Sequence, residues 1–213
     1  MSTSVLQQKP GAGGTVGRGP DDLAPGDGGR GDGAPGIIGD TARFGLMAFL
    51  GTISMLFIGF TSAYLIRRTS LDWRPLRAPG ILWLNTAVLL TSSVTLEAAR
   101  RRLRGWDLRG VTSWVAATGA LGVLFLAGQV LAWRALGAQG VFLATNPHSS
   151  FFYMLTGLHG LHLLGGLVWF LAVLVQVRRM AYVPGEDGLR PFATYWHFLA
   201  GLWLYLLFLL FVL

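Results

Sequence analysis

The 213-residue sequence contains no cysteine, which excludes disulfide bonds, thiolate metal sites and thiol catalysis. Acidic residues are also scarce: there are ten, and none lies in the middle of an apolar run. Because proton and ion transporters usually carry carboxylates at membrane depth, an independent transport function is poorly supported. The sequence also lacks paired carboxylates, a nucleophile–base pair and a phosphate-binding loop, so no catalytic centre is recognisable.

Apolar residues are abundant instead, since 53% of the chain is hydrophobic and only 13% is charged. This composition is typical of membrane proteins. A spanning helix needs about 20 apolar residues, and five segments reach that length: about 43–66, 80–98, 111–135, 149–177 and 191–213. The sequence therefore predicts an all-α integral membrane protein with a five-helix transmembrane domain at 41–213.

Residues 1–40 differ from the rest of the chain because they are rich in glycine, proline and aspartate and nearly free of aromatic residues. Such a segment cannot bury enough apolar surface to offset the entropy lost on ordering. We expect a disordered cytoplasmic tail.

The net charge of +7 does not indicate nucleic-acid binding, because the arginines form short clusters that flank the apolar runs. Twelve of the 17 lysine and arginine residues lie in the tail and in the second and fourth connections, and five lie on the opposite side. The positive-inside rule then predicts a cytoplasmic N-terminus and a C-terminus outside.

The two histidines of FFYMLTGLHGLHLLGG, His159 and His162, lie three residues apart on one face of the fourth span. Together with His197 in the fifth span they could form a haem or metal site. However, His162 lies roughly 20 Å from the cytoplasmic end of its span and His197 only about 9 Å from the same side, so their depths differ. No carboxylate stands nearby to complete a metal site.

The alternative interpretation is that the polar groups inside the spans connect helices or contact lipid head groups. We favour it for Asn85, Gln129, Tyr195 and Trp196 as well as for the three histidines. Glu97, near the cytoplasmic end of the second span, is expected to pair with Arg101 one helical turn later. The predicted structural or lipid-contacting residues are Asn85, Glu97, Gln129, His159, His162, Tyr195, Trp196 and His197, and we predict no catalytic, cofactor-binding or metal-binding residue.

The last three spans resemble subunit III of the haem–copper terminal oxidases (cytochrome c oxidase subunit 3). The stretches that carry the resemblance are LGVLFLAGQVLAW, FFYMLTGLHGLHLLGGLVWF and YWHFLAGLWLYLLF, in that order. The first two spans fit as well, so the resemblance covers residues from about 43 to 213. The five-span count resembles the short form that lacks the family's first two helices.

The resemblance implies a multi-pass subunit of the cell inner membrane that is itself non-catalytic within a cytochrome c oxidase complex. Such a subunit has no redox centre, binds phospholipid, and supports catalytic subunit I and its proton uptake during aerobic electron transport. Haem and copper are then expected in the partner subunits, which include subunits I and II and other respiratory complex subunits. The sequence leaves two alternatives open: a related subunit of a quinol oxidase or nitric oxide reductase, and a free-standing membrane haem or metal protein.

Overall fold

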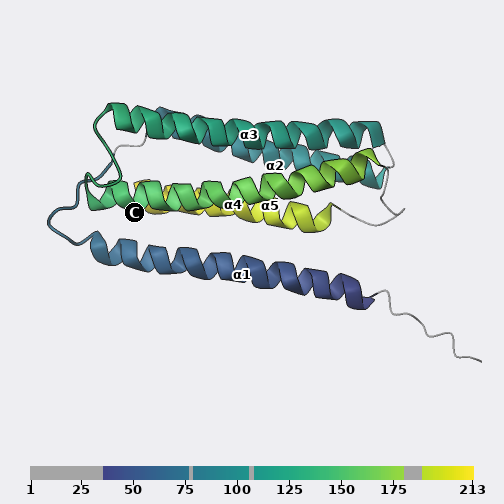
Figure 1. The fold of residues 1–213 in the computed structure, drawn as a ribbon, viewed down its shortest axis with the longest axis horizontal. Coiled ribbons are helices and arrows are strands. Elements are labelled where there is room, and N and C mark those ends of the chain that lie inside the picture. The colour runs from purple at the N-terminus through teal and green to yellow at the C-terminus, as the bar shows by residue number, and fades with distance from the viewer. Residues whose placement is uncertain (1–35, 77–78, 106–107, 180–188) are drawn as a thin grey trace, which may run out of the picture. The chain divides into compact units, whose positions relative to one another are not determined.

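The structure, a computed structural model, describes residues 36–76, 79–105, 108–179 and 189–213. Five helices make up its secondary structure (Figure 1): α1 (Gly36–Arg67), α2 (Gly80–Arg104), α3 (Leu108–Ala138), α4 (Pro147–Arg178) and α5 (Arg190–Phe211). No strand occurs in these four ranges. All five helices are long and apolar enough to cross a membrane, which confirms the predicted fold class of an all-α protein with five spans.

The helix limits differ from the predicted spans mainly at α1 and α2. α1 begins at Gly36, so residues 36–40 belong to a helix instead of the predicted tail. α2 continues to Arg104 because the run AARRRLR consists of strong helix formers. The rest of the predicted tail, residues 1–35, lies outside the described residues.

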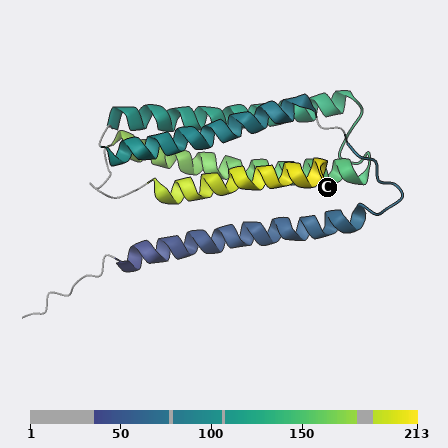
Figure 2. The same cartoon turned by 180° about the vertical axis from the view of Figure 1, so that it is seen from behind.

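Backbone contacts divide the chain into two units, Met1–Ile37 and Ile38–Leu213. Within the second unit, α2, α3, α4 and α5 form a four-helix bundle, as Figures 1 and 2 show from opposite sides. Each helix of the bundle packs against two others: α2 against α3 and α5, and α4 against α3 and α5. The buried core of the unit is formed mainly by leucine and aromatic side chains of these four helices.

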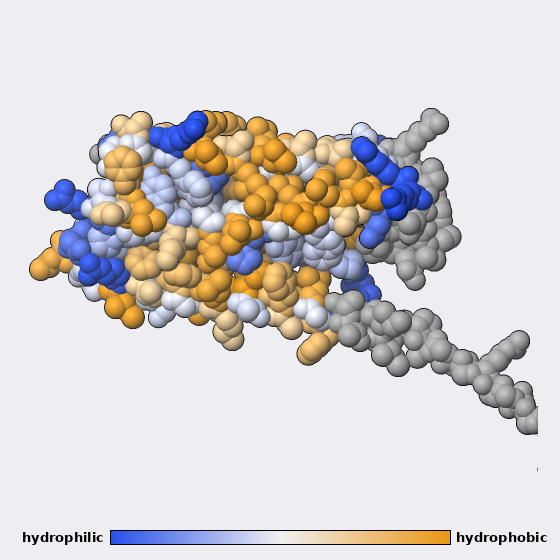
Figure 3. Space-filling model, in the orientation of Figure 1, coloured by the Kyte–Doolittle hydropathy of each residue, from blue (hydrophilic) through white to orange (hydrophobic). Residues whose placement is uncertain are grey.

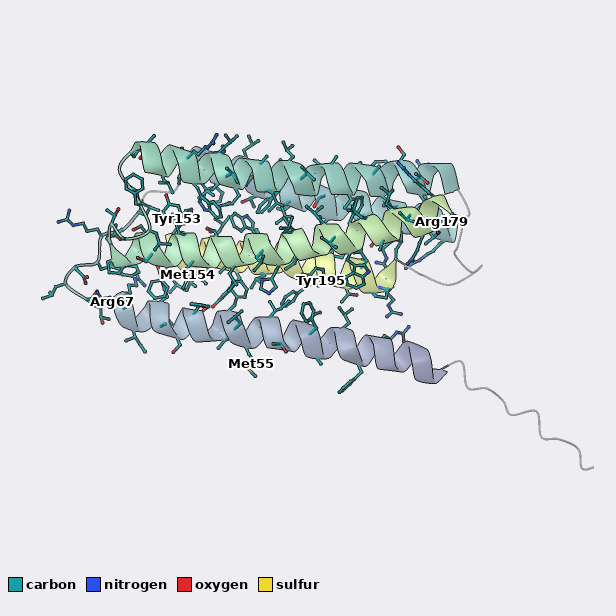
Figure 4. All side chains as sticks on the ribbon, in the orientation of Figure 1. Met55, Arg67, Tyr153, Met154, Arg179 and Tyr195 are labelled. Carbon is teal, nitrogen blue, oxygen red and sulfur yellow. The ribbon has the colours of Figure 1, made fainter. Side chains whose placement is uncertain are left out.

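α1 joins the bundle through long side chains and without close backbone approach. No Cα atom of α1 lies within 8 Å of a Cα atom of another helix where the structure describes the chain. Phe57 contacts the ring of His162 on α4 at 6.0 Å between centroids, and Thr61 shares a 2.8 Å hydrogen bond with Tyr205 on α5. Met55, on the far side of α1, points away from the bundle (Figure 4) and is 73% exposed.

The glycines of α3 allow other helices to approach closely. A Cβ atom added to Gly122 would lie 2.7 Å from the Trp196 ring of α5 and 3.1 Å from Leu167 of α4. At Gly128 an added Cβ atom would collide with the amide oxygen of Asn85 on α2. Small residues at such positions let helices pack by van der Waals contact where no hydrophobic effect drives association.

The connection between α3 and α4 is determined by local sequence at both ends. Gly140 has φ +75°, and its N–H donates to Gly137 while the next N–H donates to Leu136. This is the Schellman pattern, which requires a left-handed residue after the helix and so favours glycine. α4 then begins with a capping box, in which Asn146 and Ser149 bond each other's backbone N–H, followed by Pro147 in the first turn.

On the face shown in Figure 3, hydrophobic side chains cover much of the length of the helices. Most of the strongly hydrophilic residues on this face lie near the helix ends. Large apolar residues are exposed on every helix, for example Ile58, Trp83, Leu124, Leu161 and Phe208. In water such exposure would be unfavourable, whereas lipid accommodates it.

Candidate functional site

Three tryptophans, the buried Trp196 and Trp203 and the partly buried Trp133, donate their indole N–H groups to hydroxyl groups on neighbouring helices. Trp196 of α5 donates to Ser92 of α2 at 3.0 Å, and Trp203, two turns later, donates to Thr86 at 3.0 Å. Trp133 of α3 donates to Thr156 of α4 at 3.1 Å. Each hydroxyl in turn donates to a carbonyl of its own helix, so it both accepts and donates a hydrogen bond.

Two further bonds connect α2 to α3. The Asn85 amide donates to the Phe125 carbonyl at 3.0 Å, which is possible because Gly128 lets the two helices approach. Nearly three turns after Asn85, the hydroxyl of Thr95 on α2 lies 2.9 Å from that of Thr118 on α3. The polar side chains of the bundle thus tie its helices together at several depths.

His159 is the most deeply buried histidine, with no exposed surface. Its ring lies between Phe125 of α3, at 5.8 Å with an edge-to-face arrangement, and Trp203 of α5, at 5.2 Å. Neither ring nitrogen has a hydrogen-bond partner within the described part of the chain. His159 therefore faces the interior of the four-helix bundle.

His162 is half-buried and points to a different neighbour, Phe57 of α1. Its Nδ1 atom bonds the Leu158 carbonyl one turn back at 2.7 Å. We expected His159 and His162 to share a face, but a spacing of three residues leaves about 60° between two side chains on a helix. That angle is enough to send one ring into the bundle and the other towards α1.

His197 lies in a third environment, in a surface groove between α2 and α5 that Glu97 and Arg101 also line. Glu97 bonds Arg100 at 2.7 Å, whereas the predicted partner Arg101 is 4.0 Å away. The predicted ion pair with Arg101 is therefore present, and Glu97 also makes a shorter contact with Arg100 that the sequence analysis did not predict. The Arg100 side chain, only 15% exposed, folds back along the helix to Glu97, while that of Arg101 is 78% exposed.

Tyr195 and Trp196 are both buried residues of α5. The hydroxyl of Tyr195, which is labelled in Figure 4, donates to the His162 carbonyl of α4 at 2.8 Å. The Tyr195 ring stacks on Phe49 of α1 at 6.0 Å between centroids. Trp196 is fully buried against Phe192 and the Gly122 backbone. Gln129 of α3 is buried too, and neither its amide nitrogen nor its amide oxygen has a hydrogen-bond partner in the four described ranges.

His148 is a buried polar residue that our sequence analysis missed, because it precedes the predicted start of the fourth span by one residue. The Leu76 N–H donates to its Nδ1 at 2.8 Å, so the proton lies on Nε2, which donates to the Leu210 carbonyl at 3.0 Å. Trp73 stacks on the ring at 4.9 Å. One neutral imidazole thus joins the loop after α1, the start of α4 and the end of α5.

The histidines do not converge. His148, His159, His162 and His197 each have different surroundings, and no group of three histidine, aspartate or glutamate side chains with metal-binding proximity occurs where the structure describes the chain. What the geometry offers is a set of interhelical contacts distributed along the bundle.

The chain is similar in sequence to known proteins. The chain matches the sequence model of the family described as cytochrome c oxidase subunit III over residues 35–213. It is 34% identical over 184 residues to cytochrome c oxidase subunit 3 of Synechocystis sp., covering 82% of this chain and 76% of that protein. The corresponding protein of Thermostichus vulcanus is 34% identical over 180 residues, covering 82% and 88%.

A more distant relative, cytochrome c oxidase subunit 3 of Bacillus sp., is 27% identical over 173 residues and covers 79% of this chain and 84% of that protein. The matched region includes all five helices that are long and apolar enough to span a membrane. The chain is therefore a multi-pass membrane protein that belongs to the cytochrome c oxidase subunit III family.

Proposed function

We propose that this chain is the accessory subunit III of a respiratory haem–copper terminal oxidase in the cell inner membrane, packed directly against catalytic subunit I. In this proposal the chain carries no redox centre, and haem and copper belong to its partner subunits. Its role is to stabilise subunit I and its proton uptake while electrons flow to oxygen. The observation that supports it most is that the polar side chains of the bundle connect helices at several depths, while the histidines lie apart.

The proposed orientation places the N-terminus in the cytoplasm and the C-terminus outside. Arg67 lies at the end of the helices where α1 connects to α2, and Arg179 lies at the opposite end (Figure 4). The second end also carries Arg100, Arg101, Arg102 and Arg104 at the end of α2. Since clustered arginines favour the cytoplasmic side, this end is assigned to the cytoplasm.

The site residues are assigned structural or lipid-contacting functions. Asn85, Tyr195 and Trp196 hold helices together through the bonds described above, and Glu97 and His197 lie in a groove at the cytoplasmic end. Bound phospholipid is part of the proposal as well. A groove between α1 and α5, lined by apolar side chains such as Phe57, Ile58 and Leu202, suits an acyl chain.

The test is purification of the tagged full-length chain from its native membrane in mild detergent. Co-purification of a haem-containing oxidase with bound copper, identified by absorption spectrum and mass spectrometry, is the expected result. A tagged membrane protein of similar size that lacks the family motifs serves as the control. If the chain migrates alone under conditions in which the oxidase stays intact, the proposal fails.

The same preparation separates the proposal from a free-standing haem protein. After dissociation from its partners, the isolated chain is expected to show no Soret absorption band. A band that disappears in His159→Ala would assign a haem to this chain and contradict the accessory function. The haem types of the co-purified partner would identify a cytochrome c oxidase, a quinol oxidase or a nitric oxide reductase.

A further inference from the structure

Gln129 and His159 are exceptions among the polar side chains of the bundle. Most others hydrogen-bond a hydroxyl or carbonyl group, as Asn85 and Thr156 do. By contrast, both side-chain polar atoms of Gln129 and both ring nitrogens of His159 are buried and have no hydrogen-bond partner among the residues that the structure describes. Buried polar groups in folded proteins are nearly always hydrogen-bonded, to protein or to ordered water, so this pair requires a partner.

The two side chains lie at the same level of the α3–α4 interface. Phe125 of α3 contacts the His159 ring, and Trp133 of α3 bonds Thr156. Gln129 lies one turn from each of these residues, on the same face of α3. It therefore faces the turn of α4 between Thr156 and His159.

The interface has more room here than it has further along. An added Cβ atom at Gly157 or Gly160 would have its nearest neighbours 3.8 Å away, which is ordinary van der Waals contact. At Gly122, two turns before Gln129, an added Cβ atom would lie 3.1 Å from the nearest atom of α4, which belongs to Leu167. The helices are thus less tightly packed at the level of the two unpartnered side chains.

The chemistry of the pair matches a water molecule. A neutral imidazole presents one donor and one acceptor, and a glutamine amide presents donors and an acceptor. A water molecule donates two hydrogen bonds and accepts two, and buried waters typically make about three such bonds to protein groups that are otherwise unpaired. We propose that Gln129 and His159 together bind a water molecule in the interior of the four-helix bundle. This hydration site does not depend on the proposed assembly with an oxidase.

A cryo-electron-microscopy map of the full-length chain, in whatever complex it forms, tests the site directly at a resolution that shows ordered water. We expect a density peak about 2.7–3.2 Å from a side-chain atom of Gln129 and from a ring nitrogen of His159. A direct hydrogen bond between the two side chains, or the absence of any peak between them, would overturn the proposal.

Substitutions then test whether Gln129 holds the water. Gln129→Met should remove the peak, whereas Gln176→Met, the same change at an exposed position of α4, should leave it in place. A peak that persists in Gln129→Met would show that this side chain does not bind the water. If Gln129→Met does not yield folded protein, the map of the unaltered chain decides.

Stability measurements provide an independent readout. Gln129→Met and His159→Phe each remove one polar partner and leave the other buried polar group less well hydrogen-bonded. Each is therefore expected to lower the folded-to-unfolded ratio by about tenfold. The double substitution removes both polar groups and should cost clearly less than the two single losses combined. Additive losses would contradict a shared ligand.

Discussion

The hydrogen bond between Trp203 and Thr86 allows a quantitative test of how polar contacts hold this bundle together. Thr86 is 7% exposed and Trp203 1% exposed, and the indole N–H donates to the threonine hydroxyl at 3.0 Å. Valine has nearly the shape of threonine but cannot accept a hydrogen bond. Thr86→Val therefore leaves the indole N–H buried without a partner while changing little of the packing.

The magnitude follows from the cost of an unpaired buried donor. In soluble proteins that cost is about 1–3 kcal/mol. Interhelical hydrogen bonds inside membranes average about 0.6 kcal/mol and reach about 1.7 kcal/mol. We therefore expect a loss of about 1 kcal/mol, which corresponds to a decrease in Tm of about 2–4 °C for a domain of this size.

Thr91→Val is the matched control, because Thr91 lies on the same helix but is exposed and bonds only the Ala87 carbonyl of its own turn. Both variants would be unfolded thermally in one detergent at one heating rate, with helix content followed by circular dichroism. Trp203→Phe and the double variant complete a mutant cycle, in which the Thr86→Val loss should shrink once the indole is absent. Equal shifts for Thr86→Val and Thr91→Val, together with an additive cycle, would refute the reasoning.

Three further substitutions address the packing, the loop after α1 and the proposed function. Gly122→Leu should strongly reduce the yield of folded protein in size-exclusion chromatography, because the added side chain would collide with Trp196. An added Cβ atom at Gly51 would meet nothing within 4 Å, so the control Gly51→Leu should keep its yield, and equal yields of the two variants would contradict the reasoning. His148→Phe keeps a ring but removes two hydrogen bonds, so hydrogen–deuterium exchange should accelerate in the loop between α1 and α2, and unchanged exchange would count against that role. His162→Ala should leave the haem content of the purified complex unchanged but hasten loss of activity during turnover, and immediate loss of oxygen reduction in an intact complex would exclude a purely structural function.

The fold could be predicted well because its main determinant is local. Whether a segment becomes a spanning helix depends on the length of its own apolar run and on propensities within it, and all five predicted spans correspond to helices. The errors lie at the ends, as at α1 and α2, where charged or small residues continue a helix beyond its apolar part.

The site could be predicted only as a set of residue types. Glu97 shows the limit: its spacing predicted the pair with Arg101, which lies at 4.0 Å, but not the shorter 2.7 Å contact with the less exposed Arg100. His148 shows another limit, because its importance comes from residues far away in the sequence, at Leu76 and Leu210.

The sequence by itself thus determined the fold class, the number of helices and the family motifs, since each of these is contained in short continuous stretches. Only the tertiary structure decided which helix each polar side chain faces. His159 and His162 are three residues apart, yet one contacts Phe125 and Trp203 inside the bundle and the other contacts Phe57 of α1. The physical reason is that such contacts depend on the rotation and separation of whole helices, which arise from the packing of glycines and large rings between them.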